Sequence, residues 1–559
     1  MNTGSRFLRP YLCKDLLPLR SIRFALHARF FTIGRVVGTA CSTDSVESSR
    51  RADVQQRIRE LRDAGVDMYP SIVADPRLVT CKDFRQRYAT LKPEESSADE
   101  SVTLRGRVYS SRIAGSRLVF FDLVQDGHHV QVLCNLRKID PLGMSIEEFK
   151  QFYRILRRGD IFSVTGIPHR TSRGELSISV TELPRLLSPS LHRLPEELLD
   201  KATRVRIRHA DFLINPQAAQ VLRLRSCIVQ YLRNFLLNDR FVEVNTPILA
   251  DSAGGAIARP FKTSATEFPD RPIALRIAPE LWLKRMILGG IDRVFEIGPS
   301  FRNEGLDATH NPEFTTCEFY KSFASLEDLI DMTETLFSGL ALYVQRLKET
   351  QFTSLPPLDV DFTPPFRRID FISTIEDAIG RPLPDLGAPD ALRDVLQIFQ
   401  NLNIEPPSSP TLPRLLDHLS SLYLEPLCMS PTFISHHPTC LSPLAKSSRH
   451  NGNYQNVSSR VELFIGGREV VNAYEEENSP FEQRRKFEEQ LVWHDNESQG
   501  IDESYLEALE WGLPPTGGWG LGVDRLCMIF CGVQRINDVL SFGNLRNVVG
   551  LTDRGSLRR

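Results

Sequence analysis

Residues able to do chemistry gather in one stretch, Arg293–Phe323, which reads RVFEIGPSFRNEGLDATHNPEFTTCEFYKSF. Its pattern predicts two strands, Val294–Glu304 and Thr315–Tyr320, joined by a polar loop. A guanidinium, several carboxylates, a phenol, a loop histidine and an aromatic ring could thus converge on one surface. Alternating charges on a hairpin also occur where the hairpin only presents a face to water, so this stretch needs support from elsewhere in the chain.

Side chains two apart on a strand share a face. Arg302 and Glu304 are therefore expected to point the same way on the first strand, and Glu318 and Tyr320 on the returning strand. His310 lies in the loop between them. The expectation is a single surface that carries both cationic and anionic groups.

Support comes from GGWGLGVDRLCMIFCG, Gly517–Gly532, near the end of the chain. Its glycines permit close backbone approach, and an apolar segment follows with Asp524 and Arg525 set into it. A buried arginine is costly unless it meets an anion. Two interpretations stand: Arg525 pairs with Asp524, or Arg525 binds a phosphate.

Together these stretches resemble motifs 2 and 3 of class II aminoacyl-tRNA synthetases, the FRNE loop and the GLGxDR helix. HNPEFTTCEFY narrows the resemblance to lysyl-tRNA synthetase. The ending VLSFGNLRNVV and the internal segment FTPPFRRID (Phe362–Asp370) are similar to the corresponding parts of the fungal mitochondrial enzyme. The match extends over roughly residues 102–549. It implies an α+β fold, with a catalytic domain of antiparallel sheet flanked by helices and an N-terminal OB-fold β-barrel.

Composition agrees with a multidomain globular protein. The chain has 559 residues, 25% charged and 41% hydrophobic, with a net charge of −2, so it predicts two or three domains. With this charge, tRNA binding would need local basic patches. The chain contains no run of 18 apolar residues, so we expect no membrane span. The ten cysteines form no CxxC pair, which predicts a reduced compartment and no structural zinc.

The first 45 residues are predicted to be a mitochondrial presequence. Seven basic residues stand against the single acid Asp15 before Cys41, with apolar residues between them, a composition typical of transit peptides. A basic arm that grips tRNA is the alternative. Residues 46–100 are expected to form an N-terminal helical extension and a linker.

The sequence pattern of residues 101–190 predicts a barrel. Five short alternating runs are separated by glycines, which favours an OB-fold. The resemblance implies an anticodon-binding domain in which Phe120 stacks on a base and Arg112 and Gln131 contact its edge or phosphate. Without the resemblance Phe120 would be assigned to the core, because Val119, Phe120 and Phe121 cannot all face outward.

Residues 191–212 form a basic hinge, either solvated or in contact with the tRNA backbone, and residues 213–559 form the catalytic domain. Apolar residues from Val221 to Phe235 recur at helical spacing. The resemblance to motif 1 implies that this helix and the following strand, FVEVNTPIL, form a homodimer interface through the Gln217–Leu249 region.

The resemblance also implies a role for each site residue, with Arg302 and Arg525 catalytic. ATP would be bound by Arg302, Glu304, His310, Asn311, Phe314, Gly522 and Arg525. Lysine would be bound by Glu280, Arg302, Glu318, Tyr320, Asn472, Tyr474 and Glu476. His436 stands where relatives often carry an acid and is assigned no role.

A hairpin turn at Gly466-Gly467 pairs Phe464 with Glu469, which puts Glu462 and Glu469 on one face. Two carboxylates suit Mg²⁺, a cation that takes oxygen ligands. By strict alternation Asn472 falls on the opposite face from Glu469, whereas the resemblance implies that both lie in the site, so a bulge or strong twist is expected between them.

The predicted function is that of a lysyl-tRNA synthetase, which uses ATP and Mg²⁺ to activate L-lysine and charges tRNA(Lys) in the mitochondrial matrix. An aspartyl- or asparaginyl-type enzyme on the same scaffold, or an inactive RNA-binding paralogue, are the alternatives. The pocket carboxylate Glu476 favours a substrate ammonium, and Arg302, Arg525 and both metal carboxylates are present.

Overall fold

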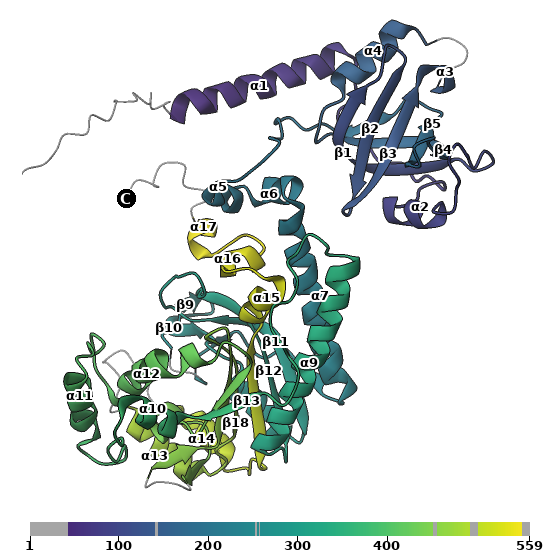
Figure 1. Ribbon diagram of the computed structural model, residues 1–559. Coiled ribbons are helices and arrows are strands. Elements are labelled where there is room, and N and C mark those ends of the chain that lie inside the picture. Colours follow the sequence, from purple (N-terminus) through teal and green to yellow (C-terminus); the bar gives the residue numbers. More distant parts are fainter. Residues whose placement is uncertain are drawn as a thin grey trace, which may run out of the picture. The chain divides into compact units, whose positions relative to one another are not determined.

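The computed structural model describes residues 43–139, 144–251, 254–255, 258–450, 455–491 and 501–549. The chain divides into two compact units, with the boundary between Arg193 and Leu194 (Figure 1). The predicted presequence, residues 1–45, lies outside the described residues up to residue 42. Helix α1 (Thr43–Asp63) then begins the described chain.

The first unit is a closed barrel. The sheet order is β1-β2-β3-β5-β4-β6, and β1 also pairs with β4, which closes it. Its strands are β1 (Val102–Ile113), β2 (Leu118–Gln125), β3 (His128–Asn135), β4 (Ile161–Arg170), β5 (Leu176–Val180) and β6 (Arg185–Ser188). The five-run expectation is confirmed, except that the fifth run divides into β5 and β6.

Three short helices accompany the barrel: α2 (Cys81–Arg87), α3 (Leu136–Ile139) and α4 (Ile146–Ile155). A capping box begins α4, because the Ser145 hydroxyl and the Glu148 carboxylate each satisfy the other's backbone N–H. The buried Arg57 of α1 ties that helix to the barrel through a 2.8 Å ion pair with Asp160, itself fully buried.

The second unit is built on an eight-stranded sheet of order β13-β14-β17-β18-β19-β12-β11-β7. The pairs β13–β14 and β11–β7 are parallel and the others antiparallel. Its strands are β7 (Val242–Glu243), β11 (Arg293–Phe301), β12 (Glu313–Ser322), β13 (Arg367–Asp370), β14 (Thr432–Ser435), β17 (Arg460–Ile465), β18 (Arg468–Glu475) and β19 (Thr516–Gly522). Two small sheets contain β8 (Leu249–Ala250), β9 (Lys262–Ala265) and β10 (Phe268–Leu275), and β15 (Ser447–Arg449) and β16 (Asn456–Ser458).

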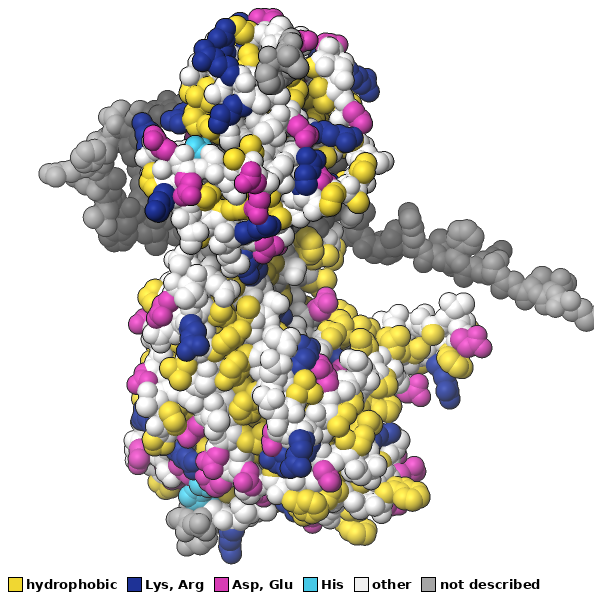
Figure 2. Space-filling model, turned by 90° about the vertical axis from the view of Figure 1, so that its right-hand side faces the viewer, with side chains coloured by type: hydrophobic (Ala, Val, Ile, Leu, Met, Phe, Trp, Pro, Cys, Tyr) yellow, Lys and Arg dark blue, Asp and Glu magenta, His cyan; other side chains and the backbone are white. Residues whose placement is uncertain are grey.

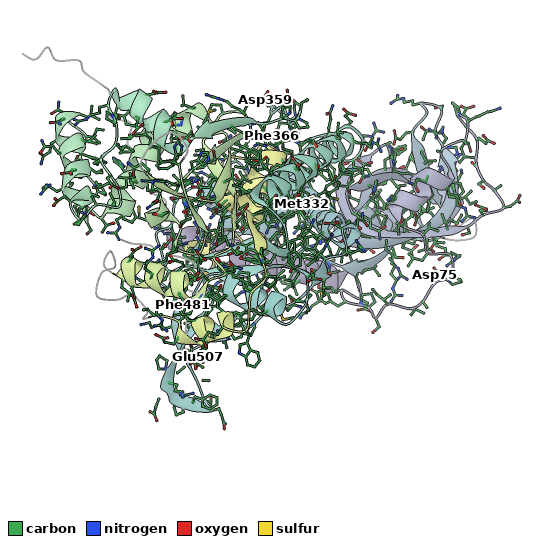
Figure 3. The ribbon with its side chains drawn as sticks, turned by 90° about the horizontal axis from the view of Figure 1, so that it is seen from below. Asp75, Met332, Asp359, Phe366, Phe481 and Glu507 are labelled. Atoms are coloured by element: carbon green, nitrogen blue, oxygen red, sulfur yellow. The ribbon has the colours of Figure 1, made fainter. Side chains whose placement is uncertain are left out.

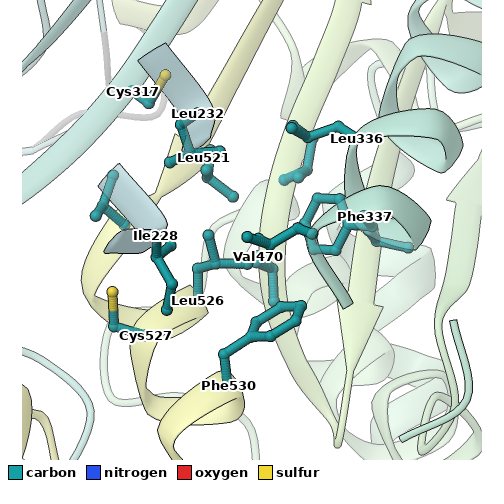
Figure 4. Close-up of a cluster of buried hydrophobic side chains, with 14 of the residues drawn as sticks. Ile228, Leu232, Cys317, Leu336, Phe337, Val470, Leu521, Leu526, Cys527 and Phe530 are labelled. Atoms are coloured by element: carbon teal, nitrogen blue, oxygen red, sulfur yellow. The ribbon is translucent and has the colours of Figure 1, made fainter. Parts of the chain in front are cut away.

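Helices α7 (Pro216–Asn238), α9 (Leu326–Thr350) and α15 (Val523–Cys531) pack on this sheet. Figure 4 shows Ile228 and Leu232 of α7 and Phe337 of α9 meeting Leu521 and Phe530 in one buried cluster. The helical spacing read from the sequence of α7 is confirmed, since its apolar positions are those that are buried.

The other helices surround this framework. They are α5 (Lys201–Arg206), α6 (Arg208–Ile214), α8 (Glu280–Leu288), α10 (Phe371–Ile379), α11 (Ala391–Asn401), α12 (Leu412–Tyr423), α13 (Pro480–Leu491), α14 (Glu503–Leu509), α16 (Ile536–Val539) and α17 (Leu545–Val549), with 3₁₀ turns at Glu425–Leu427 and Thr439–Leu441. Helices α13 and α14 lie side by side, marked by Phe481 and Glu507 in Figure 3. Among the described helices, none is both long and apolar enough to cross a membrane.

Two expectations about local structure were wrong. The first strand of the central hairpin ends at Phe301, so Arg302 and Glu304 belong to the loop and share no strand face. FVEVNTPIL gives only the short β7 and β8, because Pro247 lies between them. The basic hinge contains α5 and α6.

In that hinge segment the buried Asp211 accepts from both Arg204 and Arg208, at 2.7 and 2.5 Å. Lys201 and Arg206 remain exposed. Two of the four basic side chains that suggested a tRNA contact therefore share one carboxylate inside the unit.

Candidate active site

A cavity of about 1220 Å³ opens in the second unit, walled by β12, β18, β19, α8 and the loop that follows β11. The structure brings most of the predicted site residues to this one cavity. Those on its wall are Glu280, Arg302, Glu304, His310, Asn311, Phe314, Glu318, Tyr320, Glu469, Asn472, Tyr474, Gly522 and Arg525.

One end of the cavity carries arginines. Arg525 donates to His310 Nε2 at 2.7 Å and to the Glu469 carbonyl at 2.9 Å. His310 Nδ1 lies 2.7 Å from Asp307, so the imidazole can donate to that carboxylate while it accepts from Arg525. The arrangement holds a guanidinium and an imidazole together at the cavity wall, which suits a polyanion.

The interpretation in which Arg525 pairs with Asp524 was wrong. Asp524 pairs with Arg225 of α7 at 2.5 Å and also accepts from the backbone N–H of Thr315 at 2.8 Å. Arg525 is thereby left to face the cavity. Because α15 starts at Val523, adjacent residues on its first turn point in different directions.

The remaining residues expected at the ATP end are placed as follows. The Arg302 guanidinium lies over the Phe314 ring at 5.1 Å. Glu304 is exposed and Gly522 forms the end of β19. The Asn311 amide donates to the Glu313 carbonyl at 2.6 Å and accepts from the Leu545 N–H at 3.0 Å, so it also shapes the loop.

The expected bulge in β18 is present. The register passes from Leu463↔Val471 to Phe464↔Glu469, which leaves Val470 as the extra residue. One extra residue reverses the phase of alternation, so Glu469 and Asn472 reach the same cavity. The Asn472 amide oxygen accepts from Arg460 at 2.9 Å.

The two predicted metal carboxylates differ. Glu462 is engaged by Arg460 and by His437, the latter at 3.0 Å. Burial acts to raise the pKa of Glu462, but the charge of Arg460 and the contact with His437 outweigh it and lower that pKa to about 2. Burial and the charge of Glu462 raise the pKa of Glu469. Glu469 also lies 3.6 Å from the Arg525 guanidinium. Two neighbouring carboxylates fit a divalent cation, since the oxygen donors are those that Mg²⁺ takes.

Beside the cavity, but not on its wall, lies a buried lysine of the chain itself. Lys284, fully buried, donates to Glu280 at 2.7 Å and forms an ion pair with Glu476. Tyr474 also donates to Glu280, at 2.7 Å. Burial lowers the pKa of Lys284, but the two carboxylates outweigh that effect and raise it. Lys284 is the residue that sequence reasoning missed, although its position four residues after Glu280 on a helix was a readable signal.

Glu318 and Tyr320 share a face of β12, as expected, and are buried. Burial and the charge of Glu280 raise the pKa of Glu318 to about 8. Gly518 of β19 lies opposite, where a Cβ atom would come within 1.8 Å of Glu476. The carboxyl groups of Glu280, Glu318 and Glu476 outnumber the single ammonium of Lys284, so this region has a surplus of acid, although Glu476 and Lys284 are not on the cavity wall.

In the first unit, Arg112 and Phe120 are cross-strand partners, with the guanidinium 5.0 Å from the ring centre. Phe120 is half-buried on the outer face, while Val119 and Phe121 are in the core. The assignment of Phe120 to the core was wrong. Gln131 accepts from Ser177 at 3.0 Å and lies two residues from Leu133, the partner of Phe120, on the same face.

The chain matches two family models. Residues 200–546 match the tRNA synthetases class II (D, K and N), and residues 102–186 match the OB-fold nucleic acid binding domain. The chain therefore belongs to the class II tRNA synthetases of the D, K and N group. The predicted fold, a class II catalytic domain with an N-terminal OB-fold barrel, is confirmed.

Its relatives are lysine--tRNA ligases. Lysine--tRNA ligase cla4 of Cladosporium cladosporioides is 41% identical over 83% of this chain and 79% of its own length. The mitochondrial lysine--tRNA ligase of Schizosaccharomyces pombe is 38% identical over 90% of this chain and 94% of its own, and that of Saccharomyces cerevisiae 36% identical over 91% and 94%. The resemblance to lysyl-tRNA synthetases, including those of fungal mitochondria, is confirmed.

Proposed function

We propose that this chain is a lysyl-tRNA synthetase that converts L-lysine and ATP to lysyl-adenylate and transfers lysine to the 3′ end of tRNA(Lys) in mitochondria. One observation carries the proposal. A single cavity has the buried acids Glu280 and Glu318 and the arginines Arg302 and Arg525 on its wall, and a third acid, Glu476, is buried beside it and paired with Lys284. A substrate with ammonium groups and a nucleotide with phosphates would meet between these acids and arginines.

In the first step a lysine carboxylate oxygen attacks the α-phosphorus of ATP, and the bond to the departing pyrophosphate breaks. Two anions must approach each other, so fixed cations lower the barrier. Arg302 bridges the carboxylate and the α-phosphate, while Arg525 and His310 hold the terminal phosphates. No side-chain nucleophile is needed, because catalysis here is positioning and charge stabilisation.

Mg²⁺ would be held by Glu469 and Glu462 and would neutralise charge on the phosphates. The adenine would lie between Phe314 and Arg525, with Glu304 and Asn311 near its edge. For the ring to enter, the Arg302 guanidinium has to leave its position over Phe314. The tRNA 3′ hydroxyl then takes the lysyl group from the adenylate, and AMP leaves.

Lysine is favoured over aspartate and asparagine by charge. Lys284 is a cation at the amino-acid end and alone would favour an acidic substrate, but Glu280 and Glu476 already flank it. The surplus carboxyl groups suit an ammonium, which needs carboxylates when it is taken out of water. Glu280 would take the α-ammonium, and Glu476 with Tyr320 the ε-ammonium. Asn472 and Tyr474 would line the methylenes.

In the barrel, Phe120 would stack on an anticodon base of tRNA(Lys), with Arg112 and Gln131 beside it. Arg112 is exposed and Phe120 half-buried, so the ring and the guanidinium can be reached from solvent. Stacking of this kind is worth ~1–3 kcal/mol per base.

A homodimer through the Gln217–Leu249 region is supported by apolar side chains left exposed there. They are Leu237, Val242, Ile248 and Leu249. Figure 2 views the second unit from the side on which α7 and α9 lie, and hydrophobic side chains gather on this face of the unit. Light scattering of the purified chain is expected to give twice 63.4 kDa, and Val242→Asp with Leu249→Asp is expected to give the monomer.

Amino-acid-dependent pyrophosphate exchange across the twenty amino acids tests the activity. Exchange is expected with lysine, and Arg302→Ala provides the inactive control. Exchange with aspartate or asparagine instead would overturn the choice of substrate. A folded chain with no exchange for any amino acid would favour the inactive RNA-binding paralogue.

Mitochondrial localisation is tested by deletion of residues 1–45. The shortened chain is expected to charge tRNA normally and to stay in the cytosol. Its continued import would contradict the presequence, and loss of tRNA charging with import unchanged would favour a tRNA-gripping arm.

A further inference from the structure

A second cluster of ligand-type side chains lies in the catalytic unit. Asp370, His436 and His450 each offer one nitrogen or oxygen atom, and these three atoms all lie within 4.8 Å of one another. His436 Nδ1 is 2.6 Å and His450 Nε2 is 2.9 Å from the same Asp370 oxygen, Oδ2. None of the three lines the cavity described above.

The sheet brings these residues together from distant segments. Asp370 ends β13, which pairs in parallel with β14 so that Asp370 lies opposite Ser435. The next residue, His436, has a left-handed φ of 58° and is half-exposed. His450 follows β15, and its backbone N–H donates to Gln455 at 3.0 Å, which continues the β15–β16 hairpin.

The carboxylate of Asp370 is oriented independently of the histidines. It caps α10, because its Oδ1 accepts from the backbone N–H of Ser373 at 2.8 Å. The two imidazole rings meet edge to face with centres 5.0 Å apart. A fixed carboxylate with two imidazoles aimed at one point is the donor set that zinc and similar transition ions take, and imidazole nitrogen disfavours Mg²⁺ or Ca²⁺ there.

We propose that Asp370, His436 and His450 bind one divalent transition ion of the zinc class. Binding replaces the protons with which the two imidazoles contact Asp370. His436 is half-exposed, so water can complete the coordination, as in zinc sites with three protein ligands. The absence of CxxC pairs does not bear on such a site, because it uses no thiolate.

Such an ion would join three segments that flank the substrate cavity. His437, the neighbour of His436, contacts Glu462, and Ser442–Ala445, between the two histidines in sequence, line the cavity. The ion would therefore stabilise the segment 436–450 without touching substrate. Its expected effect is on thermal stability.

Zinc binding is measured on the full, tag-free chain after chelator treatment, with Mg²⁺ in excess to occupy oxygen-donor sites. One zinc per chain is expected by metal analysis after dialysis, and Co²⁺ in its place should give visible d–d absorption. His436→Gln, His450→Gln and Asp370→Asn should each weaken binding at least about tenfold. The matched control is His192→Gln, an exposed histidine of the first unit, which should bind zinc as the wild type does.

A second variant separates this site from the nucleotide site. Glu469→Gln is expected to retain zinc, whereas loss of zinc in Glu469→Gln with retention in His436→Gln would overturn the proposal. Zinc should also raise the melting temperature of the wild type and of His192→Gln, but not that of His436→Gln. A wild-type chain that holds no zinc under these conditions, although it is folded by circular dichroism, would equally overturn it.

Discussion

The two units place the side chains that are expected to contact substrate in opposite environments, exposed in the barrel and buried in the catalytic unit. In the barrel, Arg112 and Phe120 lie on the outer face, over a core built by neighbours such as Val119 and Phe121. In the catalytic unit, Glu476 and Lys284 are themselves fully buried and neutralise each other. Side chains that would bind RNA are thus separate from the core, whereas those that would bind lysine are part of it.

This difference follows from what each ligand requires. A base stacks on a ring at the surface, so its partner can be added to a finished barrel. A small ammonium compound must be taken out of water, and the carboxylates that receive it must be buried and neutralised before it arrives. Substitutions should therefore affect function alone in the barrel, and function together with stability in the pocket.

The largest effect is expected for Lys284→Met. Removal of one partner of a buried ion pair leaves Glu280 and Glu476 uncompensated, so the free energy of unfolding of the second unit should fall by ~3–5 kcal/mol. Lysine-dependent pyrophosphate exchange should be lost as well. Denaturant titration measures the first effect and exchange kinetics the second.

Lys348→Met is the matched control for that substitution. Lys348 is also buried, burial lowers its pKa, and its Nζ has no hydrogen-bond partner among the described residues. Removing an unpaired buried ammonium should leave stability unchanged or raise it. Equal losses of stability in both variants would show that the pocket depends on the volume of the lysine side chain and not on its charge.

The next effect is expected for Arg302→Ala, on catalysis alone. Loss of a fixed cation from the developing charge should lower the kcat of pyrophosphate exchange by about 10²–10³. The denaturation midpoint should stay near that of the wild type, because Arg302 lies in a loop and not in the buried charge cluster. Arg271→Ala, at an exposed arginine, should change neither quantity. If Arg271→Ala lowered kcat as much as Arg302→Ala, the loss of activity would reflect a general loss of positive charge and not the position of Arg302.

Glu476→Gln is expected to separate amino-acid binding from ATP binding. Truncating one partner of a buried charge pair costs ~2–5 kcal/mol, so kcat/KM for lysine should fall at least about tenfold while the KM for ATP is nearly unchanged. Tyr320→Phe should cost less, ~0.5–1.5 kcal/mol for one neutral hydrogen bond. Exchange assays with lysine, ornithine and arginine measure both, and unchanged lysine kinetics in Glu476→Gln would place the ammonium elsewhere.

In the barrel, function and stability are expected to respond to different substitutions. Phe120→Ala should weaken tRNA charging by ~1–3 kcal/mol, with adenylate formation and melting unchanged. Phe121→Ala, at the adjacent core position, should instead destabilise the barrel by ~3–5 kcal/mol. If Phe120→Ala also lowers the melting temperature, Phe120 contributes to the core, and the RNA-binding side chains of this unit are not separate from its core.

Features with a local signature could be predicted from the sequence alone. The barrel runs, the α7 spacing and the glycine hairpin turn each leave a period or a turn signal within a few residues. The bulge at Val470 was expected only because the family resemblance put both Glu469 and Asn472 in the site, while the turn put them out of phase. The motifs around Arg302 and Arg525 were sufficient to indicate the family.

Other features were decided only by the tertiary structure. Three consecutive apolar residues, Val119–Phe121, carry no phase that says which ring faces outward, and the register with β1 settles it. The partner of Asp524 is Arg225, 299 residues away in the chain, not the adjacent Arg525. Asp370 meets His436 and His450 across separations of 66 and 80 residues. Charged side chains pair with groups that lie close to them in the folded structure, and such contacts leave no periodic pattern in the local sequence.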